Sequence, residues 1–374
     1  MEKIESKSNR IKSIDALRGF AMFWYLGGIA VVEAFANLLP NKRLGAFIIK
    51  EMGHTDWHGL SYIDMNFPLF VFVSGMSFPM SYRKFQKLEY SKGQMYLQIL
   101  KRIVILSLIG LIYNGLFSLN ISTLRIFSPL SRIGISVGLA SIIYINTKNI
   151  KERAVWFFGI VISYVFVLKL FIAPDYLGMD NLSVDGNIVG YVDRLFFMNH
   201  LYTPTFDPEG IISTIAATST ALLGMIITDV IMLDKEKFSD KKKLRIMFIA
   251  AISLLIIGYL LHFVIVFNKR LWTSSVICFA GGYAILVFEL IYFIMDVKGK
   301  SRILEFLIAL GRNSIAGYVG YIFIDFTKTR DMIFGGIVGR MPEVLTPLIN
   351  EIGLFLIWIG IMWFMHKKKI YINP

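Results

Sequence analysis

Apolar runs of about 20 residues recur along almost the whole of this 374-residue chain. A helix of that length crosses a bilayer, and inside the membrane its backbone must satisfy its own hydrogen bonds. Three or four such runs would fit a large soluble core, but about ten would not. Charged residues make up only 17% of the sequence, whereas soluble domains carry about a quarter. The sequence therefore predicts an all-α fold, a polytopic bundle of transmembrane helices.

The distribution of lysine and arginine between these runs predicts the topology. With the N-terminus inside, the inner loops carry 23 of these residues and the outer loops 10, and cytoplasmic loops are the ones enriched in positive charge. Both termini are therefore expected in the cytoplasm, in a multi-pass protein of the inner (cytoplasmic) membrane. We interpret residues 1–374 as one transmembrane domain with about ten spans, at 14–38, 60–82, 96–118, 128–147, 154–173, 210–233, 246–267, 271–296, 303–325 and 346–366.

Composition also narrows the partners and cofactors. The net charge of +13 comes from short basic clusters between apolar runs, so the bilayer is the expected partner and no nucleic acid is predicted. The single cysteine, Cys278, excludes a disulfide framework. His54 and His58 are four residues apart, a spacing that metal sites on helices use. No His-Glu signature accompanies them and Gly59 follows in a loop, so no metal is predicted.

Two longer outer segments lie opposite the short basic inner loops. The first, 39–59, contains His54 and His58, and the second, 174–209, is acidic and contains a single arginine. Such segments fit a polar site at the outer face, although an ordinary solvated loop would account for most of the acids. The acids and the histidine of the second segment are Asp175, Asp180, Asp185, Asp193, Asp207, Glu209 and His200.

Several polar residues fall inside predicted spans, where a charge costs about 2.5–3.5 kcal/mol and is retained for pairing or function. Asp15 and Arg18 are three residues apart on one helix face, so Arg18 either pairs with Asp15 or contacts a phosphate. Arg132 and Arg312 are either ligand contacts or are satisfied within the bundle. The remaining members of this set are Asp64, Asn66 and Asn313.

Tryptophans stand at three predicted span ends. Trp57, Trp272 and Trp363 are most simply explained as interfacial aromatic residues.

Motifs spread over nearly the whole chain carry a resemblance to a known family. RIKSIDALRGFAMFW (10–24) is followed by H-x-x-W-x-G and D-x-x-FP-x-F-x-F-x-x-G-x-S (54–77). The chain is similar in these motifs to the heparan-α-glucosaminide N-acetyltransferases, a family of transmembrane acetyltransferases with bacterial relatives. Further blocks follow in the same order: LSRIG (130–134), FDPEGIISTI (206–215), TALLG (220–224), FNKRLWTSS (267–275), DVKG (296–299) and GRNSIAGYVG (311–320).

The resemblance implies an enzyme that uses cytoplasmic acetyl-CoA to acetylate the amino group of glucosamine or a glucosaminide across the membrane. The family's catalytic histidine precedes the Trp-x-Gly of the first outer loop, which corresponds to His54 here rather than His58. Lysosomal members place an asparagine near the end of the first span, where this chain reads WYLGGIA (24–30). That polar partner is therefore lost or supplied by another residue. Related enzymes are dimeric, so a homodimer is a further expectation.

Roles follow from the chemistry of acetyl transfer. His54 would act as a general base or would carry the acetyl group itself, and Asp64 would orient its imidazole or only end a helix. Asp207 and Glu209 would hold the sugar or only begin a helix, and Asn313 and Ser314 would offer neutral donors. Arg18, Arg132, Arg312 and Trp272 are the candidates for acetyl-CoA, and Trp57 is a candidate for the acceptor sugar.

Two alternatives remain at this point. An amino-sugar transporter would also have about ten spans and intramembrane charges, but we find no internal repeat of the kind that many transporters contain. An O-acetyltransferase of a surface polysaccharide would use the same donor with a different acceptor.

Overall fold

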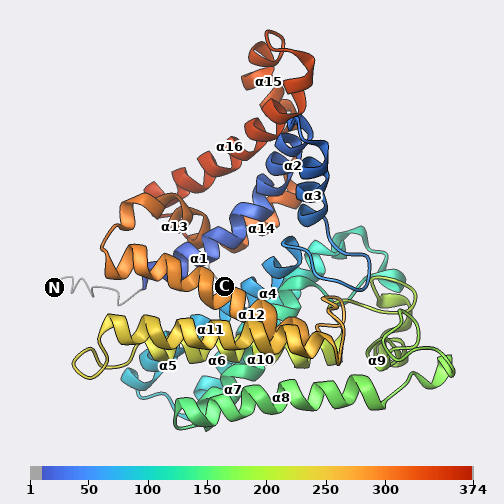
Figure 1. Cartoon of the computed structure of the whole chain (residues 1–374), viewed down its shortest axis with the longest axis vertical. Coiled ribbons are helices and arrows are strands. Elements are labelled where there is room, and N and C mark those ends of the chain that lie inside the picture. The colour runs from blue at the N-terminus through green and yellow to red at the C-terminus, as the bar shows by residue number, and fades with distance from the viewer. Residues whose placement is uncertain (1–10, 373–374) are drawn as a thin grey trace.

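The computed structural model describes residues 11–372 and shows a bundle of helices with no named strand in that range (Figure 1). The predicted all-α membrane fold is confirmed, because eight of its helices are long and apolar enough to cross a bilayer. They are α1 (Lys12–Phe23) continued by η1 (Trp24–Gly28) and α2 (Ile29–Leu38), α6 (Lys92–Tyr113), α7 (Pro129–Asn146), α8 (Ile150–Leu170), α10 (Ile211–Ile231), α11 (Asp240–His262), α12 (Ser274–Tyr292) continued by η7 (Phe293–Val297), and α16 (Thr346–Lys367) preceded by η9 (Glu343–Leu345).

Two predicted spans are broken rather than continuous. The run 60–82 becomes α4 (Asn66–Met76) and α5 (Phe78–Lys87), because Pro79 in the first turn of α5 cannot donate a helical hydrogen bond. The run 303–325 becomes α13 (Glu305–Arg312) and α14 (Ser314–Phe323), with a bend of 62° at Asn313. Eight candidate spans, or nine if the bent pair is one, therefore stand where about ten were predicted.

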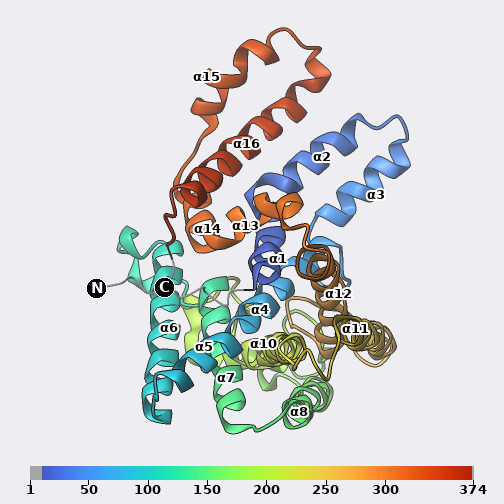
Figure 2. The ribbon, with the colours of Figure 1, turned by 90° about the vertical axis from the view of Figure 1, so that its left-hand side faces the viewer.

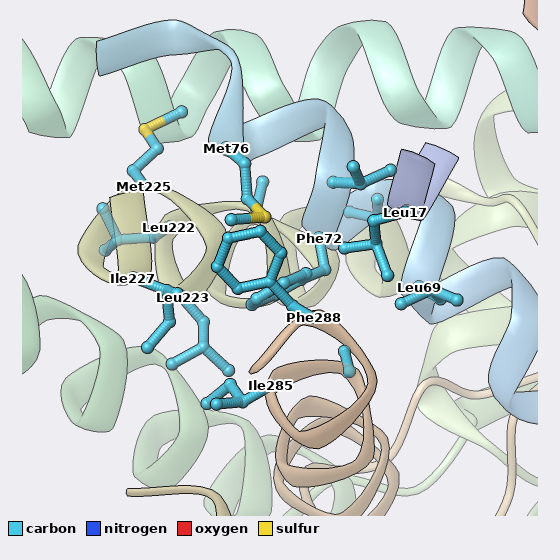
Figure 3. Close-up of a cluster of buried hydrophobic side chains, with 14 of the residues drawn as sticks. Leu17, Leu69, Phe72, Met76, Leu222, Leu223, Met225, Ile227, Ile285 and Phe288 are labelled. Atoms are coloured by element: carbon cyan, nitrogen blue, oxygen red, sulfur yellow. The ribbon is translucent and has the colours of Figure 1, made fainter. Parts of the chain in front are cut away.

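The centre of the bundle is α10, which packs against α4, α7, α8 and α12. Small residues allow α4 and α10 to approach closely: a Cβ at Gly75 would lie 2.1 Å from the Ala221 carbonyl oxygen, and one at Gly224 would lie 2.1 Å from that of Phe72. Figure 3 shows the apolar side chains that meet around this contact. They include Leu17 of α1, Leu69, Phe72 and Met76 of α4, Leu222, Leu223, Met225 and Ile227 of α10, and Ile285 and Phe288 of α12.

Two helix pairs extend away from this core. Figure 2 shows α2 with α3 (Lys42–Met52) and α15 (Thr327–Val338) with α16 projecting beyond the rest of the bundle. Helices α3 and α15 lie in segments that were predicted to be loops. Both are short, and a short helix does not produce a membrane-length apolar run.

The two ends of the described chain lie on the same side of the bundle, since Lys12 and His366 line one pocket. The loops that join α7 to α8 and α10 to α11 lie at one end in Figure 1. Helix α9 (Ile188–Phe197) and the loop after α11 lie at the other end. This arrangement agrees with the predicted topology, while the assignment of the first end to the cytoplasm stays a prediction that rests on charge.

Candidate functional site

A cavity of about 380 Å³ opens between the first outer segment and the ends of several helices. We name it the His54 cavity. Residues from several distant parts of the sequence line it, many of them aromatic or charged: Tyr25, Ile29, His54, Thr55, Ile63, Asp64, Asn66, Phe67, Phe70, Tyr113, Arg125, Pro129, Arg132, Tyr202, Pro208, Glu209, Lys269, Arg270, Trp272 and Tyr318.

His54 and Asp64 are in direct contact at this cavity. The imidazole Nδ1 lies 2.8 Å from Asp64 Oδ1, and the His54 side chain is 58% exposed while that of Asp64 is 1% exposed. A carboxylate only accepts hydrogen bonds, so Nδ1 carries the hydrogen and Nε2 keeps a lone pair. The arrangement therefore presents one nitrogen that can take a proton or attack a carbon atom.

The carboxylate of Asp64 is held from both sides. Its Oδ2 accepts hydrogen bonds from the backbone and the hydroxyl groups of Thr55 and Ser61, at 2.8–3.2 Å. Burial alone would raise the pKa of Asp64. The bond with His54, the charge of Lys269 and these donors outweigh burial and hold that pKa well below its usual range. Asp64 therefore stays ionised and fixes the imidazole.

Lys269 completes this group from the segment after α11. Its Nζ lies 3.4 Å from Asp64 Oδ1 and 3.4 Å from His54 Nδ1, and the side chain is 19% exposed. Burial lowers the pKa of Lys269, and the charge of Asp64 opposes that effect. Sequence reasoning counted Lys269 only as a loop charge, although it lies inside the FNKRLWTSS block.

The His54 segment is tied to two neighbouring loops. Gly59, at φ 119°, donates its N–H to the carbonyl of Phe267 at 2.8 Å, and a positive φ of this size favours glycine. The Trp57 indole donates to the carbonyl of Leu182 at 2.7 Å and its ring meets that of Phe206 edge-on. Trp57 thus joins the two outer segments and does not line the cavity.

Two acids of the second segment, Asp207 and Glu209, are paired with an arginine that sequence reasoning did not propose for the site. Arg125 forms a two-pronged contact with Asp207, at 2.8 Å and 2.6 Å, and also binds Glu209. Asp207 is buried and does not line the cavity, whereas Glu209 and Arg125 do. Neither Asp207 nor Glu209 lies within α10, which begins at Ile211.

Arg132 and Trp272 form part of the wall of the His54 cavity. Arg132 is 1% exposed, binds the Pro208 carbonyl and the Ser213 hydroxyl, and stacks over the Trp272 ring at 4.7 Å. Trp272 is fully buried and its indole donates to the Thr220 hydroxyl at 3.2 Å. The interfacial interpretation of Trp272 is therefore wrong, because the ring packs inside the bundle.

A second cavity, of about 320 Å³, continues from the first. The two share Phe67, Phe70, Pro129 and Tyr318 as lining residues, so they adjoin within the bundle. We name it the Arg18 cavity, after a guanidinium that donates to the Ser77 hydroxyl at 2.7 Å. Its other lining residues are Met22, Ser74, Ser77, Ser81, Arg102, Leu106, Leu130, Ile133, Ser314 and Ile315.

Arg102 and Tyr318 were missed by sequence reasoning. Arg102 falls inside the predicted span 96–118, so the rule that selected Arg18 could have found it. Tyr318 stacks on Tyr25 and Tyr113, with ring centroids 4.6 Å and 5.5 Å apart. These three tyrosines come from three distant segments, and no local pattern predicts that they meet.

Arg312 and Asn313 line neither of the two cavities. Arg312 donates to the Tyr371 hydroxyl at 2.6 Å, and the Asn313 side chain donates to the carbonyl of Ile370 and accepts from the N–H of Ile372. This placement does not fit the predicted contact of Asn313 with the acceptor. Ser314 lines the Arg18 cavity rather than the His54 cavity.

Within residues 11–372, no group of three His, Cys, Asp or Glu side chains could hold a metal ion.

Comparison of the sequence with known proteins finds one family model over part of the chain and two distant relatives over nearly all of it. The family described as a domain of unknown function, DUF5009, matches residues 10–185. The chain is 24% identical to the heparan-alpha-glucosaminide N-acetyltransferase of Mus musculus, over 99% of this chain and 61% of the relative. It is 25% identical to the enzyme of the same name from Homo sapiens, over 97% of this chain and 59% of the relative. The predicted resemblance is confirmed at the level of distant homology, and the chain spans about three fifths of these curated relatives.

Proposed function

We propose that the protein is a transmembrane N-acetyltransferase of the inner membrane. It would move the acetyl group of cytoplasmic acetyl-CoA to the amino group of glucosamine or a glucosaminide on the outer side. One observation carries the proposal: a cavity lined by Arg18 and Arg102 adjoins the cavity lined by the exposed imidazole of His54, and the two share four lining residues. Distant homology to N-acetyltransferases supports the reaction type.

The donor would enter from the Arg18 cavity. Acetyl-CoA is a long molecule with anionic phosphates at one end and a thioester at the other, and guanidinium groups bind phosphates well. The slim pantetheine arm would pass Phe67, Phe70 and Tyr318, which line both cavities. The thioester would then meet His54 while the nucleotide stays at the basic end.

The bond changes follow from the free Nε2 of His54. As the amine nitrogen attacks the thioester carbonyl, Nε2 removes a proton from the amine, the C–N bond forms and the C–S bond breaks. The thiolate of CoA then takes up a proton. In the alternative route Nε2 attacks the thioester carbonyl first, the C–S bond breaks and the CoA thiolate leaves, which gives an acetyl-imidazole. The amine then attacks that acetyl group, the bond from Nε2 to the acetyl carbon breaks, and the imidazole takes up the proton that the amine loses. Both routes need the tautomer that the 2.8 Å contact with Asp64 favours.

Lys269 and the cavity wall would have supporting roles. We propose Lys269 as a positioning residue, because it pairs with the same Asp64 oxygen that holds the imidazole. Glu209, which lines the cavity beside Arg125, is the remaining candidate for contact with the acceptor's ammonium or hydroxyl groups.

Replacement of two histidines tests the proposal. We expect His54→Ala to bind acetyl-CoA but to lose acetyl transfer to glucosamine by at least about 10³-fold. His58→Ala, which replaces another exposed histidine four residues away, is the matched control and should keep activity. The measurement is release of CoA and N-acetylglucosamine by purified protein given labelled acetyl-CoA. Full activity of His54→Ala, or uptake of labelled glucosamine into proteoliposomes without acetyl-CoA, would contradict the proposal.

A further inference from the structure

A third recess lies beside the first helix and shares no lining residue with the two cavities described above. Its volume is about 350 Å³, and we name it the Lys12 pocket. It is formed by the start of α1, the segment before and within α13, and the end of α16. The lining residues are Lys12, Ser301, Arg302, Glu305, Ile308, Arg312 and His366.

The charges of this pocket do not balance. Lys12, Arg302 and Arg312 contribute three cations against one acid, Glu305. The Glu305 carboxylate already lies 3.1 Å from the ammonium group of Lys367. Asp15, which lies outside the lining, forms an ion pair with Arg312. Lys12 and Arg302 are therefore the two lining cations that no ion pair within the described residues engages.

Two buried nitrogens at this pocket lack a hydrogen-bond partner within the described chain. They are Arg312 Nε and His366 Nδ1. The nearest acid to Arg312 Nε is Asp15, whose Oδ2 is 3.6 Å away and beyond hydrogen-bond range. Buried polar groups in proteins are nearly always paired, so these atoms point to an acceptor that lies outside the described residues, such as a bound ligand.

The position of Asp15 fixes where such an acceptor would lie. One oxygen of its carboxylate is 3.5 Å from Arg18 and the other is 3.6 Å from Arg312. The Lys12 pocket and the Arg18 cavity therefore flank one carboxylate. A ligand in the pocket would sit next to the Arg18 cavity rather than inside it.

We infer that the Lys12 pocket binds a phosphate group at the face predicted to be cytoplasmic. A phosphate supplies several acceptor oxygens and a negative charge, which suit three cations, a serine hydroxyl and two unpaired nitrogens. The source is either the headgroup of an anionic phospholipid or the 3′-phosphate of CoA, and the second source rests on the proposed function.

A charge-removal pair tests the inference. Lys12→Gln with Arg302→Gln removes two exposed cations from the pocket, so the fold should be preserved. Lys237→Gln with Lys241→Gln is the matched control, since it removes two exposed cations from the loop between α10 and α11 and from the first turn of α11. Both double variants change the net charge equally.

The lipid source is tested by native mass spectrometry in neutral detergent with added phosphatidylglycerol or phosphatidylcholine. If the source is a lipid, the wild type and the control retain phosphatidylglycerol, and the pocket variant retains about tenfold less. Phosphatidylcholine, whose headgroup carries no net charge, should not distinguish the proteins.

The CoA source is tested by calorimetric titration with CoA and with 3′-dephospho-CoA. If the pocket holds the 3′-phosphate, the wild type and the control prefer CoA by about tenfold and the pocket variant loses that preference. A loss in either assay supports the inference and identifies the source. Equal behaviour of the pocket variant and the control in both assays would overturn it. Neither assay measures acetyl transfer, so an inactive protein with an intact phosphate site would refute the proposed function alone.

Discussion

The His54 cavity and the Arg18 cavity adjoin but treat charge in opposite ways. At the first, each acid of the described lining is matched: Asp64 receives donors on both oxygens, and Arg125 engages Glu209 together with the buried Asp207 behind it. At the second, none of the described lining residues is acidic; Asp15 pairs with Arg18 from outside the lining at 3.5 Å, and no ion pair within the described residues engages Arg102. Matched charges hold a reactive group still, whereas an excess of cations suits the arrival of an anion.

The largest expected effect is on the rate of acetyl transfer, and it follows from replacing the Asp64 carboxylate that holds His54. Asp64→Asn can present an amide N–H to Nδ1, which favours the tautomer with no lone pair on Nε2. We expect acetyl transfer to fall roughly 10³-fold while acetyl-CoA affinity stays within about twofold. The measurement is steady-state kinetics beside equilibrium binding. Asp56→Asn, an exposed acid in the same loop, is the control, and an active Asp64→Asn enzyme would refute the role of Asp64.

Removal of Arg125 tests whether its ion pairs with Asp207 and Glu209 also stabilise the fold. Arg125→Met leaves the Asp207 carboxylate buried without its ion-pair partner, and loss of one member of a buried pair costs about 3–5 kcal/mol. We expect a clear drop in thermal unfolding temperature in detergent. Lys367→Met, which breaks the exposed pair with Glu305, should change it little. Equal shifts for the two variants would argue against a buried pair.

The Arg18 cavity should respond in binding rather than in chemistry. Arg102→Gln removes one of the two cations, so we expect KM for acetyl-CoA to rise about tenfold with little change in kcat. Lys101→Gln, an exposed neighbour on the same helix, is the control. A fall in kcat at unchanged KM would contradict the assignment of binding to the Arg18 cavity and of chemistry to the His54 cavity.

The smallest expected effect is on the pH dependence of stability, and it comes from Asp193, a buried acid of the second outer segment. Asp193 is buried, and burial raises its pKa from 3.8 to about 7 against the opposing bond from Ile211. Because the folded state then holds the proton more tightly than the unfolded state, the stabilisation is complete below about pH 4 and is lost as the pH rises through about 7. We expect the unfolding temperature of the wild type to fall by a few degrees between pH 5 and pH 8.

Asp193→Asn provides the test of that assignment, because an amide does not titrate. Its unfolding temperature should change less with pH over the same interval. Parallel curves for the two proteins would assign the pH dependence to other groups.

Much of the fold could be predicted from local sequence. The first span, predicted as 14–38, is observed as Lys12–Leu38 because a long apolar run leaves the chain few alternatives. Helix α3 was not predicted, since a short amphipathic stretch in an outer loop gives no membrane-length signal. The bend at Asn313 was not predicted either, because it depends on tail residues almost sixty positions away.

The same holds for the site: contacts between residues close in sequence could be predicted, and contacts between distant residues could not. His54 and Asp64 are ten residues apart, and two such polar side chains at the start of an apolar run are conspicuous in the sequence itself. Arg125 and Asp207 are 82 residues apart, and Lys269 reaches His54 across 215. Such contacts depend on how the helices pack, and the spacing of residues along the chain does not report it.

The attachment of the C-terminal segment to Asn313 has a practical consequence. The amide of Asn313 exchanges hydrogen bonds with Ile370 and Ile372 at the point where α13 turns into α14, so the tail works as a brace for that turn. A deletion that ends before Ile370 would free the turn. An affinity tag joined directly behind this segment would lie close to these hydrogen bonds, so a long flexible spacer is the better choice for purification.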